Sequence, residues 1–190
     1  MARWAPDAAL RLERAAMELF TENGYAATTV PAIAERAGLT TRTFFRHFAD
    51  KRDVLFLRER EFPSVVAHLL TDAPAGLGTI DLLMHGLDGA ASGDLERWRD
   101  DIAARRAIIR SEPQLREREL LKSAGLADAM RDALVSNGTP APDAALAASA
   151  ASALFDLALE TWLAGPPGVT LTSILHDHRL RLTRLLAPSA

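Results

Sequence analysis

Apolar residues recur at intervals of three and four along almost the whole chain, which is the spacing of one face of an α-helix. Strict alternation of apolar and polar positions, which would indicate half-buried strands, is almost absent. Clusters of glycine and proline interrupt the helical pattern at 71–78, 89–93, 112–113, 137–140 and 165–168. The pattern therefore predicts an all-α protein.

The breaks divide the chain into nine expected helices. The ranges are about 7–21, 29–37, 40–48, 50–70, 79–88, 94–111, 113–137, 142–164 and 171–187. Pro63 lies inside the fourth range, and proline removes a backbone N–H from the helical ladder. We therefore expect that helix to be kinked or interrupted.

The second and third helices are short and meet at a glycine. Thr29 and Thr40 stand where helix N-caps are expected, and Gly38 suits a left-handed exit from the first of the pair. Phe44 and Phe48 are four residues apart, so both anchor the second of the pair inward. This is the layout of a helix-turn-helix, which presents its second helix to the DNA major groove.

Seven short pieces of sequence surround this turn in a fixed order. They are Glu18-Leu19-Phe20, Asn23-Gly24-Tyr25, Thr28-Thr29-Val30, Ile33-Ala34, Ala37-Gly38-Leu39, Thr43-Phe44-Phe45-Arg46-His47-Phe48 and Asp50-Lys51. From about Ala8 to about Leu57 the chain thus resembles the N-terminal DNA-binding domain of the tetracycline-repressor (TetR) family. The resemblance implies a nine-helix, TetR-like architecture. Its helix-turn-helix domain would occupy residues 1–50, and its ligand-binding and dimerisation domain residues 51–190.

Base contacts are expected from the start of the second helix of the pair. Arg42 can make a paired hydrogen bond to a guanine edge, and Thr41 and Thr43 offer a hydroxyl or a methyl group. The alternative for Arg42 is a solvated charge on a helix face. The full set of predicted DNA contacts is Thr28, Thr29, Thr40, Thr41, Arg42, Thr43, Phe45, His47 and Lys51.

Phosphate contacts are expected around these positions, because hydroxyls, imidazoles and lysines commonly bind the DNA backbone. Thr28, Thr29, His47 and Lys51 are the phosphate candidates, and the resemblance implies this role for Lys51 in particular. The alternative for Lys51 is a solvated side chain that does not contact DNA, and the alternative for Thr29 is that it only caps its helix. Two positions depart from the family pattern. Phe45 stands where the family most often has tyrosine, and Pro31 removes an N–H near the start of its helix.

The charge of the chain changes this picture only slightly. The net charge is −3, but residues 1–60 carry ten Lys/Arg against eight Asp/Glu, and the remainder carries twelve against seventeen. A weakly basic first part on an acidic body fits a specific DNA binder with modest non-specific affinity. We expect a cytoplasmic protein that is not bound to a membrane, because no window approaches an uninterrupted apolar span of about 18 residues.

Enzymatic and metal-dependent functions find no support in the residue pattern. The chain has no cysteine, so disulfides and thiolate chemistry are excluded. His176 and His178 are two residues apart and point away from each other on a helix, and no serine lies in a glycine elbow. We predict no catalytic residue, no metal site and no cofactor.

The expected ligand-binding and dimerisation domain, residues 51–190, carries apolar stripes that most simply form a core. The family resemblance implies that part of them lines a cavity for a small molecule. The predicted ligand contacts are Met84, Trp98, Ile102, Arg105, Phe155, Leu159 and Trp162. Large apolar side chains favour an apolar or amphipathic ligand, and Arg105 can meet an acidic head group.

The last two long helices suit a helix-pair interface. Small residues mark one (Ala148, Ala151, Ala158) and leucines the other (Leu175, Leu182, Leu185, Leu186). Two copies of the chain can pair them into a four-helix bundle, or a single chain can bury the same stripes internally. A dimer is favoured, since one recognition helix makes few base contacts.

These observations predict a homodimeric transcriptional regulator, most simply a repressor that binds a palindromic operator and is released by a small amphipathic or hydrophobic effector. Alternatives within this class are an activator and a regulator without a ligand. From other classes, a small-molecule-binding or interaction protein that has lost DNA binding fits the changes at Phe45 and Pro31, and an enzyme is the remaining alternative.

Overall fold

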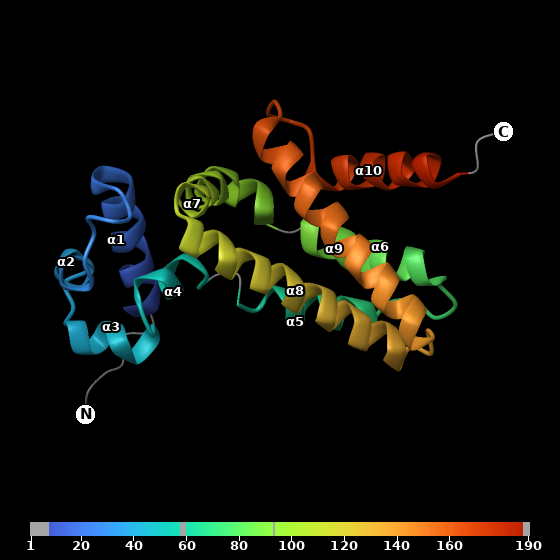
Figure 1. Cartoon of the computed structure of the whole chain (residues 1–190), viewed down its shortest axis with the longest axis horizontal. Coiled ribbons are helices and arrows are strands. Elements are labelled where there is room, and N and C mark those ends of the chain that lie inside the picture. Colours follow the sequence, from blue (N-terminus) through green and yellow to red (C-terminus); the bar gives the residue numbers. More distant parts are fainter. Residues whose placement is uncertain (1–7, 58–59, 93, 188–190) are drawn as a thin grey trace. The chain divides into compact units, whose positions relative to one another are not determined.

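A computed structural model describes residues 8–57, 60–92 and 94–187, and within them every regular element is a helix (Figure 1). The all-α prediction is thereby confirmed. The helices are α1 (Ala8–Asn23), α2 (Val30–Arg36), α3 (Thr41–His47), α4 (Lys51–Leu55), α5 (Phe62–Thr71), α6 (Thr79–Ala91), a 3-10 helix η1 (Asp94–Trp98), α7 (Arg99–Ser111), α8 (Pro113–Ser136), α9 (Ala141–Ala164) and α10 (Leu171–Leu186).

The chain divides into two compact units. One is formed by Met1–Arg60 together with Asp101–Glu117, and the other by Glu61–Asp100 together with Arg118–Ala190. The first unit thus contains α1 to α4, most of α7 and the start of α8. Its core joins Leu12 and Phe20 of α1 to Phe44 of α3, and it also includes Ile109 and Leu115.

Side-chain caps fix where the short helices of the first unit begin. The Oγ1 atoms of Thr29 and Thr40 accept from the backbone N–H groups of Ala32 (3.3 Å) and Thr43 (3.1 Å). Asp50 caps α4 by accepting from the N–H of Arg52 at 2.8 Å. Each cap satisfies a backbone donor that the first turn of a helix leaves without a partner.

The helix expected at 50–70 is interrupted. Helix α4 ends at Leu55 and α5 begins at Phe62, with Pro63 in the first turn of α5. Proline is tolerated there because the first turn has no intrahelical acceptors for its N–H groups. The break, together with the 3-10 turn that precedes α7, accounts for the difference from the nine helices expected.

Helix α9 is the central element of the second unit, where it packs against α6 and α10. By length and composition alone α9 could cross a membrane, but 44% of its most apolar window is buried inside the protein. It buries Ala148, Ala158 and Trp162 against its neighbours, as a core helix does. On α6, a Cβ at Gly86 would come within 2.7 Å of Leu70, so the glycine permits the close approach of α5.

Candidate nucleic-acid interface and apolar groove

Helix α3 presents to solvent a face that is polar except for Phe45. Thr41, Arg42, Phe45 and Arg46 are exposed, and Phe45 keeps 59% of its surface. Thr43 and His47 are half-buried at the edges of this face. Among the described residues the Arg42 side chain makes no hydrogen bond or ion pair, so its guanidinium is available to a ligand such as a base edge.

The opposite face of α3 is anchored in the core. Phe44 is fully buried, Phe48 almost so, and their ring centroids lie 5.3 Å apart. The turn before α3 is fixed by Gly38, whose φ of +64° only glycine adopts without strain. The N–H of Leu39 donates to the carbonyl of Ala34 at 2.8 Å, which closes the C-terminus of α2 as a Schellman motif. The exposed face of α3 is therefore held in place by the buried phenylalanines behind it and by the hydrogen-bonded turn before it.

Several of the predicted DNA contacts use their polar groups within the protein. Thr28 is buried, and its hydroxyl is within hydrogen-bond distance of the carbonyls of Leu19 (3.1 Å) and Gly24 (2.9 Å). The exposed Thr29 and Thr40 serve as N-caps, and Thr40 also contacts the Thr43 hydroxyl at 3.0 Å.

Lys51 is likewise engaged. Its Nζ donates to the carbonyls of Tyr25 (2.7 Å), Thr28 (2.9 Å) and Ala26 (3.3 Å). The same atom lies 4.2 Å from the centroid of the Tyr25 ring. Burial lowers the pKa of the Lys51 ammonium, and the Glu112 carboxylate opposes that shift.

Two other cations of this unit are paired with carboxylates. Arg36 forms ion pairs with Glu22 at 2.8 Å and with Glu18 at 3.3 Å. Arg52 binds the Asp50 carboxylate, with Nε at 2.8 Å. Hydrogen bonding to Arg36 lowers the pKa of Glu22, although desolvation opposes the shift. Because their charges are partly neutralised by these carboxylates, Arg36 and Arg52 attract DNA less strongly than Arg42 does.

The predicted ligand contacts are divided between the two units. Ile102 and Arg105 belong to the first unit, and the other five residues belong to the second. Phe155, Leu159 and Trp162 are buried in the core, with the Phe155 ring 5.2 Å from that of Phe62. Trp98 is 39% exposed.

Arg105 is buried within the first unit. Its guanidinium donates to the Glu13 carboxylate and to the carbonyl of Leu55, each at 2.6 Å. Sequence patterns miss this pairing because Glu13 occupies a charged position on an otherwise ordinary amphipathic helix. Nothing local indicates that its partner lies 92 residues along the chain.

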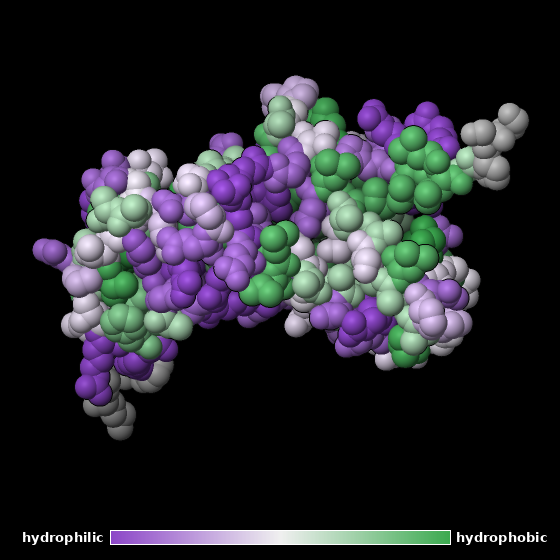
Figure 2. Space-filling view, viewed as in Figure 1, coloured by the Kyte–Doolittle hydropathy of each residue, from purple (hydrophilic) through white to green (hydrophobic). Residues whose placement is uncertain are grey.

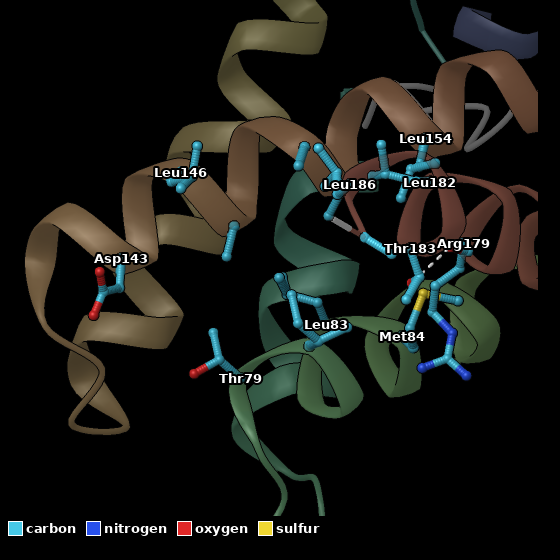
Figure 3. A pocket seen from close by; sticks show the side chains of 15 residues that line it. Thr79, Leu83, Met84, Asp143, Leu146, Leu154, Arg179, Leu182, Thr183 and Leu186 are labelled. Carbon is cyan, nitrogen blue, oxygen red and sulfur yellow. Dashed lines mark hydrogen bonds between the residues drawn. The ribbon is translucent and has the colours of Figure 1, made fainter. Parts of the chain in front are cut away.

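An apolar groove of about 770 Å³ does occur in the second unit, between α6, α9 and α10 (Figure 3). Of the predicted ligand contacts it includes Met84. Its other lining residues are Thr79, Ile80, Leu83, Asp143, Leu146, Ala147, Ala150, Ala151, Leu154, Arg179, Leu182, Thr183, Leu186 and Ala187. Figure 3 shows Arg179 and Met84 at one end, with Asp143 at the other.

Arg179 gives this groove a cationic end. One of its terminal nitrogens, Nη1, lies 3.4 Å from the Asp81 carboxylate, and its Nε is buried without a hydrogen-bond partner among the described residues. An apolar trough with a guanidinium at one end suits an amphipathic molecule that carries an acidic head.

Exposed leucines lie on α9 and α10, and two of them, Leu146 and Leu186, line the groove. Figure 2 shows hydrophobic residues gathered over α10 and the adjoining part of α9. On α9, Leu146 (74% exposed) and Leu157 (56%) form a stripe with Ala150 and Ala153, at spacings of four, three and four. By contrast Ala148, Ala151, Ala158 and Leu175 are buried within the chain. For these four residues the structure thus matches the alternative in which a single chain buries the stripes internally.

Comparison with known proteins gives matches in both the sequence and the fold. Residues 13–56 match the family described as "Bacterial regulatory proteins, tetR family". The chain is 38% identical over 90 residues to the HTH-type transcriptional regulator TcmR of Streptomyces glaucescens, covering 47% of this chain and 38% of TcmR. It is 46% identical over 43 residues to the regulator HbdR of Aromatoleum sp. (strain CIB), covering 23% of this chain and 19% of HbdR. The similarity in sequence thus spans less than half the length of either relative.

Solved structures extend the similarity of fold to nearly the whole chain. One is Thermus thermophilus FadR, a TetR-family repressor in complex with lauroyl-CoA, with a TM-score of 0.59 and 24% identity over 96% of this chain and 97% of that one. Another is a regulator from Pseudomonas aeruginosa PAO1, with a TM-score of 0.67 and 17% identity over 97% of this chain and 93% of that one. At these identities the structural matches establish the fold.

Proposed function

We propose that this chain is a bacterial DNA-binding transcriptional regulator of the tetR family, whose model its residues 13–56 match, and that it acts as an effector-responsive repressor that binds a palindromic operator as a homodimer. The members of this family are regulators and not enzymes, in agreement with the sequence prediction. The observation that carries the proposal is the exposed face of α3, where Arg42 has no partner among the described residues and which Phe44 and Phe48 anchor from behind.

The exposed face supplies the chemistry that base reading requires. Arg42 can donate in pairs to the O6 and N7 atoms of a guanine, and Thr41 offers a hydroxyl beside it. Phe45 offers an apolar ring, which suits a thymine methyl or the sugar edge. A single α3 reads only a few base pairs, so two copies on a palindrome are needed for useful specificity.

The α9 stripe, whose Leu146 and Ala150 also line the groove, is the surface that we propose for dimerisation. Leu146, Ala150, Ala153 and Leu157 repeat at the spacing of a coiled-coil seam, and the two alanines permit close approach of a second helix. Burying one exposed leucine contributes about 1.5–3 kcal/mol. In a symmetric dimer each copy would bury its own Leu146 and Leu157, so the interface would cover four leucines.

The groove between α6, α9 and α10 is the site that we propose for the effector. Its volume lies in the usual range for small-molecule pockets, about 300–1,000 Å³. Thermus thermophilus FadR, which shares the fold, was solved with lauroyl-CoA, and an acyl chain with an acidic head matches the apolar walls and Arg179 here. Effector binding would favour a spacing of the two α3 helices that no longer fits successive major grooves.

We place this activity in the cytoplasm, where operator DNA and the effector meet. The test is selection of genomic fragments by the purified protein, followed by footprinting and titration at several salt concentrations. We expect a palindrome whose half-sites are one helical turn apart and an affinity that falls as salt rises. Binding that is equal for all fragments would refute the repressor, and increased transcription from the bound promoter would indicate an activator.

A further inference from the structure

Lys51 stands at the first position of α4, where the sequence suggested a phosphate contact. In the structure three backbone carbonyls, of Tyr25, Ala26 and Thr28, converge on its ammonium at 2.7, 3.3 and 2.9 Å. A lysine ammonium has three N–H donors and no acceptor. Each donor therefore has a carbonyl inside the protein, and the Tyr25 ring covers the cation at 4.2 Å.

The three carbonyls belong to the connection between α1 and α2. That connection begins at Gly24, whose positive φ of 79° turns the chain out of α1. It ends at Thr29, the N-cap that fixes the start of α2. Thr28 is held in addition by its own hydroxyl, through the carbonyls of Leu19 and Gly24. The Lys51 ammonium thus joins the start of α4 to the segment that determines where α2 begins.

We propose that Lys51 is a positioning residue of the DNA-binding unit, which holds the α1–α2 connection and through it α2 and α3, and that it does not bind a DNA phosphate. The inference rests on the proposed function and concerns how the same interface is kept in shape. A phosphate could take the ammonium only if its hydrogen bonds to three carbonyls were given up, and hydrogen bonds made by a charged group are among the stronger ones in proteins.

The two roles differ in what they require of the side chain. A phosphate contact needs a positive charge that reaches the DNA backbone, which arginine supplies as well as lysine. The carbonyl cluster needs a compact ammonium with three diverging donors, and the flat guanidinium of arginine does not reproduce that geometry. Lys51→Arg therefore separates the roles, and Lys51→Met removes both.

Operator binding by the full-length dimer is measured for the wild type, Lys51→Met and Lys51→Arg from low to high salt, at a temperature where circular dichroism shows each to be folded. We expect both variants to bind roughly tenfold more weakly with the salt slope of the wild type. Lys122→Met is the matched control, because Lys122 is the other lysine of the chain and lies in the second unit.

The single tyrosine provides a direct signal for the cluster. Tyr25 is the only tyrosine, so the protein labelled with 3-fluorotyrosine gives one fluorine resonance. Lys51→Met should move this resonance in the protein without DNA, and Lys122→Met should leave it in place. An unmoved resonance in Lys51→Met would mean that the ammonium does not sit on the ring, and would overturn the proposal even if that variant is less stable.

Three further results would also overturn it. The first is wild-type binding by Lys51→Arg, together with a salt slope for Lys51→Met that is smaller by about 1 for each phosphate that the lysine had neutralised. The second is wild-type affinity in both variants. The third is a wild-type protein that prefers no DNA sequence, which would refute the proposed function as well and is recognised without any Lys51 variant.

Discussion

Arg105 and Glu13 form an ion pair at 2.6 Å with only 5% and 2% of their side chains exposed. The guanidinium also donates to the carbonyl of Leu55, so α7 is bonded to both α1 and α4. Both contacts lie within the first unit, where Ile109 and Leu115 add apolar contacts from the same segment. A helix from the middle of the chain is therefore part of the unit that carries the helix-turn-helix.

We expect Arg105→Met to be strongly destabilising, because it leaves the Glu13 carboxylate buried without its guanidinium. Loss of one partner of a buried ion pair typically costs about 3–5 kcal/mol, whereas replacing both with apolar groups is often close to neutral. Urea unfolding of Arg105→Met, Glu13→Met and the double variant tests this. A double variant that is less stable than both single variants would contradict it.

The sequence predicted what depends on local chemistry. The caps Thr29 and Thr40, the turn at Gly38 and the inward pair Phe44 and Phe48 all stand where patterns of a few residues placed them. Each is set by hydrogen bonds or side-chain contacts within one or two turns of helix, so the local layout of the helix pair could be predicted from the sequence.

What the sequence could not supply depends on residues far apart in the chain. From the sequence, Arg105 could pair equally well with an acidic ligand or with an acidic side chain. Only the fold places Glu13 beside it. Similarly, Lys51 donates to carbonyls about 25 positions earlier in the chain. The types of the residues do not indicate where their backbone carbonyls point. Leucine and alanine stripes on α9 likewise do not show which face the chain itself will bury.

Arg42→Ala should weaken operator binding by about 1–3 kcal/mol and relax the base preference at one position of each half-site. The reason is that its guanidinium has no partner within the described residues and projects from the exposed face of α3. Arg52→Ala is the control, since it removes the same charge from a guanidinium that already binds Asp50. Competition titrations on single-base operator variants measure both. Equal losses on operator and random DNA would make Arg42 a phosphate contact.

Placing glutamate at both Leu146 and Leu157 should convert the dimer to a monomer. The change puts two charges of each copy into the proposed seam, where burying them would require costly desolvation. Leu120→Glu with Leu121→Glu is the matched control, because those leucines of α8 are 71% and 68% exposed. Sedimentation velocity distinguishes the species. If only the control pair dissociates the dimer, the interface lies on α8.

The α1–α2 ion pairs should weaken in acid. Hydrogen bonding to Arg36 lowers the pKa of Glu22 below its usual value of 4.5. A carboxylate with a lowered folded-state pKa stabilises the fold above its unfolded-state pKa, and that stabilisation is lost as the pH falls through the folded value. The difference in urea midpoint between wild type and Glu22→Gln should thus be present at neutral pH and vanish once the pH lies below the lowered folded-state pKa of Glu22. Glu35→Gln is the matched control, because Glu35 is an exposed carboxylate of α2 and the ion pairs of Arg36 are with Glu22 and Glu18.

A long-chain carboxylate should bind the groove and raise the melting temperature of the protein. Stabilisation by mass action reaches about 2.7 kcal/mol when the ligand is at 100 times its Kd. Arg179→Met removes the cationic end, and Ala147→Phe fills the apolar trough, so both should reduce the shift. Arg184→Met is the control for charge, because Arg184 is exposed on the same helix and does not line the groove. Thermal-shift titrations with fatty acids, acyl thioesters, aromatics and cationic drugs define the preferred class.

The same ligand should weaken operator binding, and operator DNA should weaken the ligand by an equal factor, because the coupling free energy between two sites is reciprocal. Gel shifts with increasing ligand measure the first effect, and calorimetric titration of ligand into the protein–operator complex measures the second. Arg179→Met should keep the operator affinity of the wild type while losing the response to the ligand. If Arg179→Met and Ala147→Phe respond as the wild type does, the effector binds elsewhere. If no ligand changes either signal, the protein regulates transcription without this kind of effector, and the role of α3 in binding DNA is unaffected.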